Sequence, residues 1–157
     1  MEAQRAAPGR TQLDDVAKAI IEQLQEDGRR PYATIGKAVG LSEAAVRQRV
    51  QKLIDGNVMQ IVAVTDPLQT GFHREAMVGV NADGDLDQVA AALAEIAEID
   101  YVIITAGSFD ILCEVLAVDD DHLLRLITRI RAVPGVRRSE SFVYLRLTKQ
   151  TYNWGAR

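Results

Sequence analysis

The side chains best suited to recognise another molecule lie between Ser42 and Leu53, in the segment SEAAVRQRVQKL. If this segment is a helix, a step of about 100° per residue brings Val46, Val50 and Leu53 together as an apolar stripe. The rest of its surface then carries small side chains, amides and cations. The candidate binding residues on that surface are Ser42, Ala44, Ala45, Arg47, Gln48, Arg49, Gln51 and Lys52.

Several of these residue types match the edges of DNA bases. The amide of Gln48 can bond N6 and N7 of adenine, and the guanidinium of Arg47 can bond O6 and N7 of guanine. Lys52, farther along the helix, is better placed for a phosphate. Arg49 falls near the apolar stripe, so it either holds an acidic neighbour within the domain or reaches a phosphate. Because ordinary solvated amphipathic helices have similar faces, the neighbouring elements must decide between the two interpretations.

The elements before this helix favour DNA binding. Apolar residues at helical spacing predict a first helix over residues 13 to about 27. Thr34 can N-cap a short second helix that stops at Gly40, and Ser42 can N-cap a third that runs to about Asp55. Two short helices joined by a tight turn predict a helix-turn-helix whose second helix reads the DNA.

The segment after the third helix leads into a different kind of domain. Asn57 stands where a left-handed residue would close the helix, residues 58–64 are apolar and β-branched, and residues 66–71 form a natural hinge. We expect 58–64 to be a strand. Farther on, the pattern predicts strands over 76–80, 101–105, 111–118 and 136–147, with helices around 86–97 and 123–130. This βαββαβ order predicts a ferredoxin-like domain whose helices cover one face of a four-stranded antiparallel sheet and leave the other to a partner.

The loop Gly107-Ser108-Phe109-Asp110 is the second candidate site. Gly107 permits a close backbone approach, and the N–H groups of such a turn can hold a carboxylate. Asp110 could meet the α-ammonium group of an amino acid. The alternative is a plain hairpin loop in which Asp110 stabilises the turn through the backbone.

The composition is typical of a globular protein and argues against a membrane-spanning or strongly basic one. The 157 residues are 48% hydrophobic and 25% charged, as in an average globular protein. No apolar run is long enough to span a bilayer, residues 1–12 read as a disordered leader, and a lone cysteine suits a reducing, cytoplasmic setting. Residues 1–66 hold nine basic and nine acidic residues, so the net charge of −4 lies entirely in residues 67–157. Any nucleic-acid binding must therefore come from a local patch.

The sequence contains few residues with the types and spacing of a catalytic or metal-binding site. His73 and His122 lie far apart without metal-ligand spacing, so we expect no metal and no cofactor. Cys113 lies in an apolar strand and is better interpreted as a core residue than as a nucleophile. The carboxylates of residues 119–121 are expected to cap the helix that follows. Trp154 either packs on another subunit or covers the domain.

Taken together, these motifs resemble the Lrp/AsnC (feast/famine) family of prokaryotic transcription regulators. The resemblance spans residues 13–157. In the front half it rests on Leu13-Asp14, Leu24, Gly28-Arg29, Gly40-Leu41-Ser42, Val46, Arg49-Val50, Leu53 and Val58-Met59. In the back half it rests on Gly107-Ser108-Phe109-Asp110, Val133-Pro134-Gly135-Val136 and Ser141-Phe142-Val143-Tyr144-Leu145.

The resemblance implies an α+β chain with a helix-turn-helix, winged-helix-like domain over 13–58, a strand linker over 59–73 and an effector-binding, oligomerising domain over 74–157. It also implies homodimers, which in this family often assemble into octamers, and double-stranded DNA partners with pseudo-palindromic operators. A small effector, usually an amino acid, would bind near Gly107, Ser108, Phe109, Asp110 and Ser141. The sequence departs from the family at Ala17, usually Asp, at Asn57, usually Gly, and at Ser139 and Ser141, usually Thr.

Two other functions remain open at this point. Siroheme decarboxylases resemble this family in fold, but such an enzyme needs basic residues and histidines around a tetrapyrrole pocket, which the two histidines here do not suggest. An architectural protein that bends DNA without an effector is the third interpretation, and the low basicity argues against it.

Overall fold

The computed structural model describes residues 12–157. Apart from Gln12, the leader expected over residues 1–12 lies outside the described residues. The chain divides into two compact units, and each is described here by itself. The first comprises the described residues up to Ala63 together with Lys149–Arg157, and the second is Val64–Thr148.

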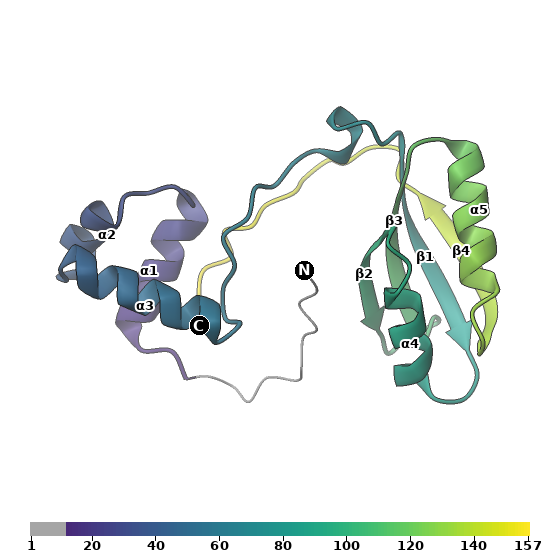
Figure 1. Cartoon of the computed structure of the whole chain (residues 1–157), viewed down its shortest axis with the longest axis horizontal. Coiled ribbons are helices and arrows are strands. Elements are labelled where there is room, and N and C mark those ends of the chain that lie inside the picture. The colour runs from purple at the N-terminus through teal and green to yellow at the C-terminus, as the bar shows by residue number, and fades with distance from the viewer. Residues whose placement is uncertain (1–11) are drawn as a thin grey trace. The chain divides into compact units, whose positions relative to one another are not determined.

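The first unit is helical (Figure 1). Its helices are α1 (Asp15–Glu26), α2 (Tyr32–Val39) and α3 (Glu43–Asp55). Gly40, at φ +72°, ends α2, and the Ser42 hydroxyl accepts the N–H of Ala45 at 3.2 Å, so the predicted turn and cap are confirmed. The hydrophobic core of the unit contains the buried side chains of Ile20, Leu24, Ile35, Val46 and Val50.

One helix boundary in this unit was predicted wrongly. The helix α2 begins at Tyr32 rather than after Thr34, because the carbonyl of Pro31 already accepts the N–H groups of Thr34 and Ile35 at 2.9 and 3.1 Å. A proline at this position has its φ preset and loses no helical hydrogen bond. Thr34 therefore lies inside the first turn.

The segment after α3 is not a strand, contrary to expectation. Asn57 has φ +54°, as predicted for the residue that closes α3. Residues 58–64 pair with no described strand. The N–H groups of Val58 and Met59 donate instead to the carbonyl of Leu53 at 2.9 and 3.2 Å, and Ile61, Val62 and Val64 are 44, 67 and 57% exposed. A strand needs a neighbour for its backbone N–H and C=O groups, and among the described residues no strand pairs with this segment.

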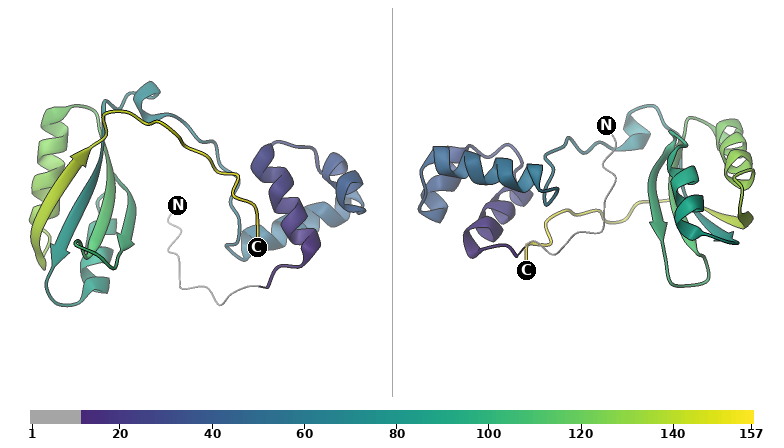
Figure 2. Two further views of the ribbon diagram at one scale, coloured as in Figure 1. Left: turned by 180° about the vertical axis from the view of Figure 1, so that it is seen from behind. Right: turned by 60° about the horizontal axis from the view of Figure 1, so that its bottom comes forward.

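The second unit has the predicted βαββαβ order (Figures 1 and 2). Its elements are β1 (Arg74–Ala82), α4 (Leu86–Ala94), β2 (Ile99–Ile104), β3 (Ile111–Ala117), α5 (Asp120–Arg131) and β4 (Val136–Val143). The strands form one antiparallel sheet in the order β2-β3-β1-β4. Both helices lie on the same side of this sheet (Figure 2, right), so the predicted α+β architecture is confirmed.

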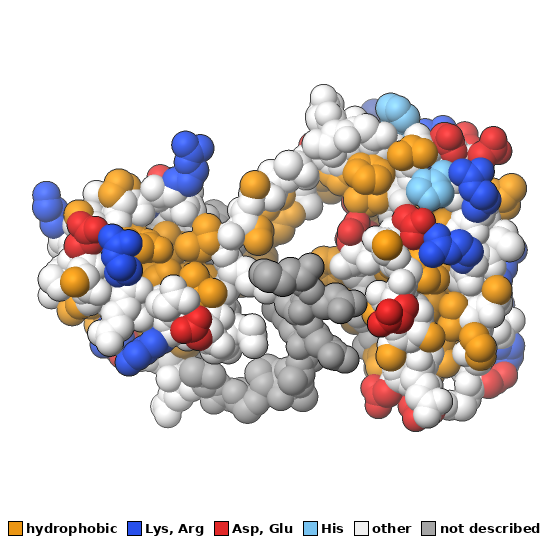
Figure 3. Space-filling view, in the orientation of Figure 1, with side chains coloured by type: hydrophobic (Ala, Val, Ile, Leu, Met, Phe, Trp, Pro, Cys, Tyr) orange, Lys and Arg blue, Asp and Glu red, His pale blue; other side chains and the backbone are white. Residues whose placement is uncertain are grey.

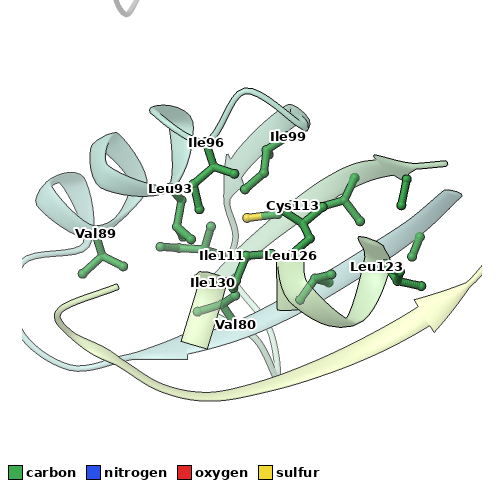
Figure 4. Close-up of a cluster of buried hydrophobic side chains, with 14 residues drawn as sticks. Val80, Val89, Leu93, Ile96, Ile99, Ile111, Cys113, Leu123, Leu126 and Ile130 are labelled. Atoms are coloured by element: carbon green, nitrogen blue, oxygen red, sulfur yellow. The ribbon is translucent and has the colours of Figure 1, made fainter. Parts of the chain in front are cut away.

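The helix-covered face of the sheet carries the core (Figure 4). Cys113 points into this cluster among Ile99, Leu126 and other apolar side chains, and burial raises the pKa of its thiol to about 12. A thiol so hard to ionise is a poor nucleophile, which agrees with the expected core role. Asp119 caps α5, as predicted for the acidic run, by accepting the N–H of His122 at 2.6 Å.

The last strand is shorter than predicted. It ends at Val143 instead of continuing to residue 147, and Leu145 is 96% exposed. By its contacts, the segment Lys149–Arg157 belongs to the helical unit. There the N–H of Gly155 donates to Oε1 of Gln25 at 2.9 Å, and Ala156 packs with Ala17, Ile21 and Leu53.

Candidate DNA-binding helix and effector loop

Burial of one side of α3 determines which of its side chains reach solvent. Val46 is fully buried, and Val50 and Leu53 are 2 and 7% exposed. Of the candidate DNA-binding residues, Ser42, Ala44, Arg47, Gln48, Gln51 and Lys52 are exposed, while Ala45 and Arg49 are half-buried. The helix therefore presents a continuous polar surface opposite its apolar stripe.

Arg49 forms an ion pair with an acidic residue of the same unit. Its Nη1 lies 2.7 Å from Oδ2 of Asp14, the residue that caps α1. The hydrogen bond from Arg49, together with the N–H of Ala17, holds the pKa of the Asp14 carboxyl below its usual range. Arg49 thus ties α3 to the start of α1 in this structure, as expected for an arginine that holds an acidic neighbour within the domain.

Some of the remaining polar residues of α3 already form hydrogen bonds or ion pairs within the helical unit. Arg47 donates to Oε1 of Glu43 at 2.7 Å, and its guanidinium lies 5.4 Å from the centroid of the Tyr32 ring. Gln51 donates to Oδ1 of Asp55 at 2.7 Å. Exposed pairs of this kind are worth about 0.2–1 kcal/mol, so a base or phosphate can replace them at small cost.

Two residues on this surface are free of such partners. Within residues 12–157, no side-chain hydrogen bond or ion pair engages Gln48 or Lys52. On the face drawn in Figure 3, the basic side chains of the helical unit stand apart with acidic ones between them. The charge pattern therefore favours a few local contacts over a broad basic patch.

The effector loop is held to strand β1 by its own polar groups. Oδ2 of Asp110 accepts the N–H of Ala82 at 3.0 Å and the Asn81 amide at 3.4 Å, and the same amide donates to the carbonyl of Ser108 at 2.8 Å. The Thr105 hydroxyl donates to the carbonyl of Phe109 at 2.6 Å. The Asp110 carboxylate is therefore already engaged, as in the turn-stabilising alternative.

The ring of Phe109 packs against the face of the sheet that carries no helix, next to Gly79. A Cβ added to Gly79 would lie 2.6 Å from its ring, so only glycine leaves room for it there. The ring also meets that of Phe142 edge-on, with centroids 5.9 Å apart. Gly107 and Ser108 remain exposed beside it.

Ser141 is the one expected effector residue that the structure does not bring to this loop. It is paired with Val78, whose side chain is fully buried beneath the helices, whereas Gly79 under Phe109 belongs to the opposite face. Successive residues of a strand point to opposite faces, so Ser141 and Phe109 are separated by the sheet. Asn81, which anchors the loop, was not predicted from the sequence; the available signal was a polar residue directly after the predicted strand over 76–80.

No other class of site competes among the described residues. No group of three or more His, Cys, Asp or Glu residues there could hold a metal ion. None of the described helices is long and apolar enough to cross a membrane.

Two parts of the chain match two known domains in the expected order. Residues 13–54 match the AsnC-type helix-turn-helix domain, and residues 72–157 match an AsnC-type C-terminal dimeric alpha+beta barrel domain. The chain belongs to the Lrp/AsnC family of transcriptional regulators, so the resemblance inferred from its motifs is confirmed. Within that family it combines a DNA-binding helix-turn-helix with an AsnC-type ligand-binding domain.

Individual relatives agree with this assignment. HTH-type transcriptional regulator Rv2324 of Mycobacterium tuberculosis is 36% identical over 85% of this chain and 92% of its own length. HTH-type transcriptional regulator FL11 of Pyrococcus horikoshii is 31% identical over 90% of this chain and 95% of its own length. The crystal structure of the Mycobacterium tuberculosis leucine response regulatory protein, 28% identical, superposes with a TM-score of 0.79 and covers 88% of this chain and 96% of that one. These relatives are named as regulators and not as enzymes, which decides against the decarboxylase alternative.

Proposed function

We propose that this chain is a sequence-specific regulator whose second unit senses a small metabolite, an amino acid, and alters the affinity of α3 for DNA. The observation that carries the DNA-reading part is the polar surface of α3, where Gln48 and Lys52 have no competing partner in the described chain. Gln48 and Arg47 read bases, and Lys52 contacts phosphate. Ser42, Ala44, Ala45 and Gln51 line the same surface.

The proposed working unit is a homodimer. The sheet face without helices exposes Tyr101, Ile103 and Phe142, at 57, 42 and 45%, and residues 58–64 add an unpaired apolar segment. Burial of such side chains stabilises association, and the matched C-terminal domain is described as dimeric. A two-fold dimer presents two copies of α3, so its operator is pseudo-palindromic, with half-sites about one helical turn or a multiple apart.

The effector is proposed to bind at subunit interfaces of the second unit, near the loop from Gly107 to Asp110. Two relatives support an amino acid: one is named a leucine response regulatory protein, and the structure of a Neisseria meningitidis regulator, TM-score 0.78 and 22% identical, was solved as an L-Met complex. Binding shifts the population between states that differ in the placement of the two α3 helices. Dimers assembling further, into octamers, would present the effector with more interfaces.

The test combines a ligand screen with DNA binding. A thermal-shift screen of the twenty amino acids and related keto acids on the full chain identifies binders. Each binder is then added to a fluorescence-anisotropy titration of the gene's own upstream DNA. We expect at least one amino acid to raise the melting temperature and to change operator affinity by about 5- to 150-fold, the usual range of allosteric coupling. No response to any of these compounds would reject the sensing part and leave the DNA-reading part to stand.

A further inference from the structure

The chain passes between its two units twice. It leaves the helical unit after Ala63, forms the second unit from Val64 to Thr148, and returns to the helical unit with Lys149–Arg157. Two stretches of chain therefore connect the units. We call residues 60–65 the front connector and residues 145–154 the tail connector, which is the yellow end of the chain in Figure 1.

Both connectors are fixed to neighbouring points of the sheet. The front connector reaches β1 through the turn η1 (Pro67–Gln69), where Oδ1 of Asp66 accepts the N–H of Leu68 at 2.9 Å. The tail connector follows β4, and the N–H of Tyr144 donates to the carbonyl of Glu75 in β1 at 2.9 Å. Because β1 and β4 are hydrogen-bonded neighbours, the start of β1 and the end of β4 lie at the same end of the sheet.

At the helical unit, the two connectors are fixed to different helices. The front connector continues from α3, and Met59 before it packs into the apolar cluster that contains Leu53. The tail connector ends on α1, where the N–H of Gly155 donates to Oε1 of Gln25 at 2.9 Å and Ala156 packs into the same apolar cluster. Gly155 has φ +75°, a backbone conformation that favours glycine.

The helices that carry these two anchors are held together as one body. Val50 of α3 and Ile20 of α1 share the buried core of the unit, and Arg49 lies 2.7 Å from Asp14. A single connector limits how far such a body can move but leaves it free to turn. A second connector, fixed to another helix, removes much of that rotational freedom.

The connectors themselves are short and carry no structure of their own. Within residues 12–157, no hydrogen bond engages residues 60–65 or 145–154. An extended chain spans at most about 3.6 Å per residue, so the front and tail connectors reach about 25 and 40 Å. Lengths of this order allow the helical unit to turn when only one connector is fixed, and they restrict it when both are.

We propose that the C-terminal tail is a second tether that orients α3 and so restricts the spacing of operator half-sites that a dimer accepts. Both copies of α3 in a dimer enter the major groove, so the half-sites must lie on one side of the DNA, about one helical turn or a multiple apart. Gln25, Gly155 and Ala156 are positioning residues, because they act on α3 through the body of the helical unit. This inference rests on the proposed DNA-reading dimer and adds what determines its preferred spacing.

Duplexes with graded half-site spacing test the tether. The half-site is located by footprinting on the gene's own upstream DNA and is placed in duplexes singly, as an inverted pair at the natural spacing, and as a pair lengthened by about five base pairs, half a helical turn. Fluorescence anisotropy measures the affinity of the full chain for each. We expect the wild type to bind the lengthened pair about 10- to 100-fold more weakly than the natural pair, because the second α3 no longer reaches its half-site and the gain from two linked sites is lost.

Two variants release the tail without placing a charge in the helical unit. Gly155→Pro removes the N–H that bonds Gln25 and cannot adopt the positive φ, and Gln25→Leu removes the acceptor while keeping a good helix former. Each should reduce the penalty for the lengthened pair to about 3-fold or less and leave binding of the single half-site unchanged. Thr151→Pro is the matched control, since Thr151 is exposed and its N–H has no partner in the described chain, and it should keep the wild-type penalty.

The other outcomes separate this inference from the proposed function. If both variants keep the wild-type penalty, or if the wild type binds both spacings equally, the tail does not orient α3, although DNA reading would stand. If the variants lose affinity for single and paired half-sites alike, the tail only stabilises the helical unit and the tether is refuted. If the wild type binds the single half-site no better than scrambled DNA, the proposed DNA-reading function fails together with this inference.

Discussion

The polar residues of α3 differ in the intramolecular contacts that each must break before it can contact DNA. Gln48 and Lys52 have no intramolecular partner in the described chain, Arg47 must release Glu43, and Arg49 is held by Asp14. Side chains without a partner lose conformational freedom and hydration on binding, whereas Arg47 also loses an ion pair. Gln48 and Lys52 are therefore expected to dominate recognition and positioning respectively.

Replacing Gln48 by Ala should relax base preference at one operator position. The amide contributes roughly 1–3 kcal/mol of discrimination if it bonds a base edge. Anisotropy titrations against a set of operator variants measure this preference. An unchanged ranking of the variants would remove Gln48 as a reader.

Replacing Lys52 by Ala should weaken binding to all sequences alike and lower the salt slope by about 1, because one phosphate contact is lost. Lys18→Ala provides a matched control, since Lys18 lies on α1 and pairs with Asp15. A loss confined to particular operator sequences would count against a phosphate role.

The pair of Arg49 and Asp14 should give the helical unit an acid-sensitive component of stability. The folded-state pKa of Asp14 is lowered by the Arg49 hydrogen bond, so the pair stabilises the fold above the ordinary carboxyl pKa and loses this effect as pH falls through the lowered value. Arg49→Met should therefore lower the melting temperature at pH 7 and match the wild type more closely near pH 2. A difference that stays constant across that range would show that the ion pair is not its source.

At the scale of elements, the C-terminal segment is part of the helical unit. Ala156 packs against Ala17, Ile21 and Leu53, and Gly155 bonds Gln25. Neither contact could be inferred from the sequence, because a small residue in a polar tail carries no periodic signal. Trp154, which we expected either to pack on another subunit or to cover the domain, is 73% exposed.

Introducing a charge into this contact should loosen the helical unit. Ala156→Asp should destabilise it by about 0.5–3 kcal/mol, the usual range for disrupted packing. Hydrogen exchange of the α1 backbone amides reports this change directly. Thr151→Asp, at an exposed position of the same tail, should exchange as the wild type does, and equal effects of both substitutions would refute a specific role for Ala156.

The elements predicted correctly are those specified by local signals. The Gly40 turn and the Ser42 cap depend on residues within a few positions of one another, and the sheet strands follow their apolar patterns. Residues 58–64 and 144–147 have similar patterns but form no strand here, because a ladder needs a second strand that local sequence does not reveal. The effector loop was located by its own residues, whereas its anchor Asn81 lies about 30 positions away and depends on the β1–β3 register.

At the scale of the whole molecule, the proposed function depends on association through the face of the sheet without helices. Ile103→Asp would put a charge among Tyr101, Phe142 and their counterparts in the second copy, at a cost that burial makes large. We expect a monomer by light scattering and a loss of operator affinity. Leu124→Asp is the control, because Leu124 is 63% exposed on α5 and so lies on the other side of the unit. Dimers of normal affinity from Ile103→Asp would place the interface elsewhere.

The proposed function requires that α3 reads DNA sequence under the control of an effector bound to the second unit. The most direct measurement is an anisotropy titration of the gene's own upstream DNA and of scrambled DNA, with the wild type and Gln48→Ala, in the presence and absence of the amino acid found by the screen. We expect the wild type to prefer the upstream DNA and to change its affinity for that DNA when the amino acid is added, and we expect Gln48→Ala to lose the preference. Equal binding to both DNAs by the wild type, unaffected by the amino acid, would contradict the proposed function.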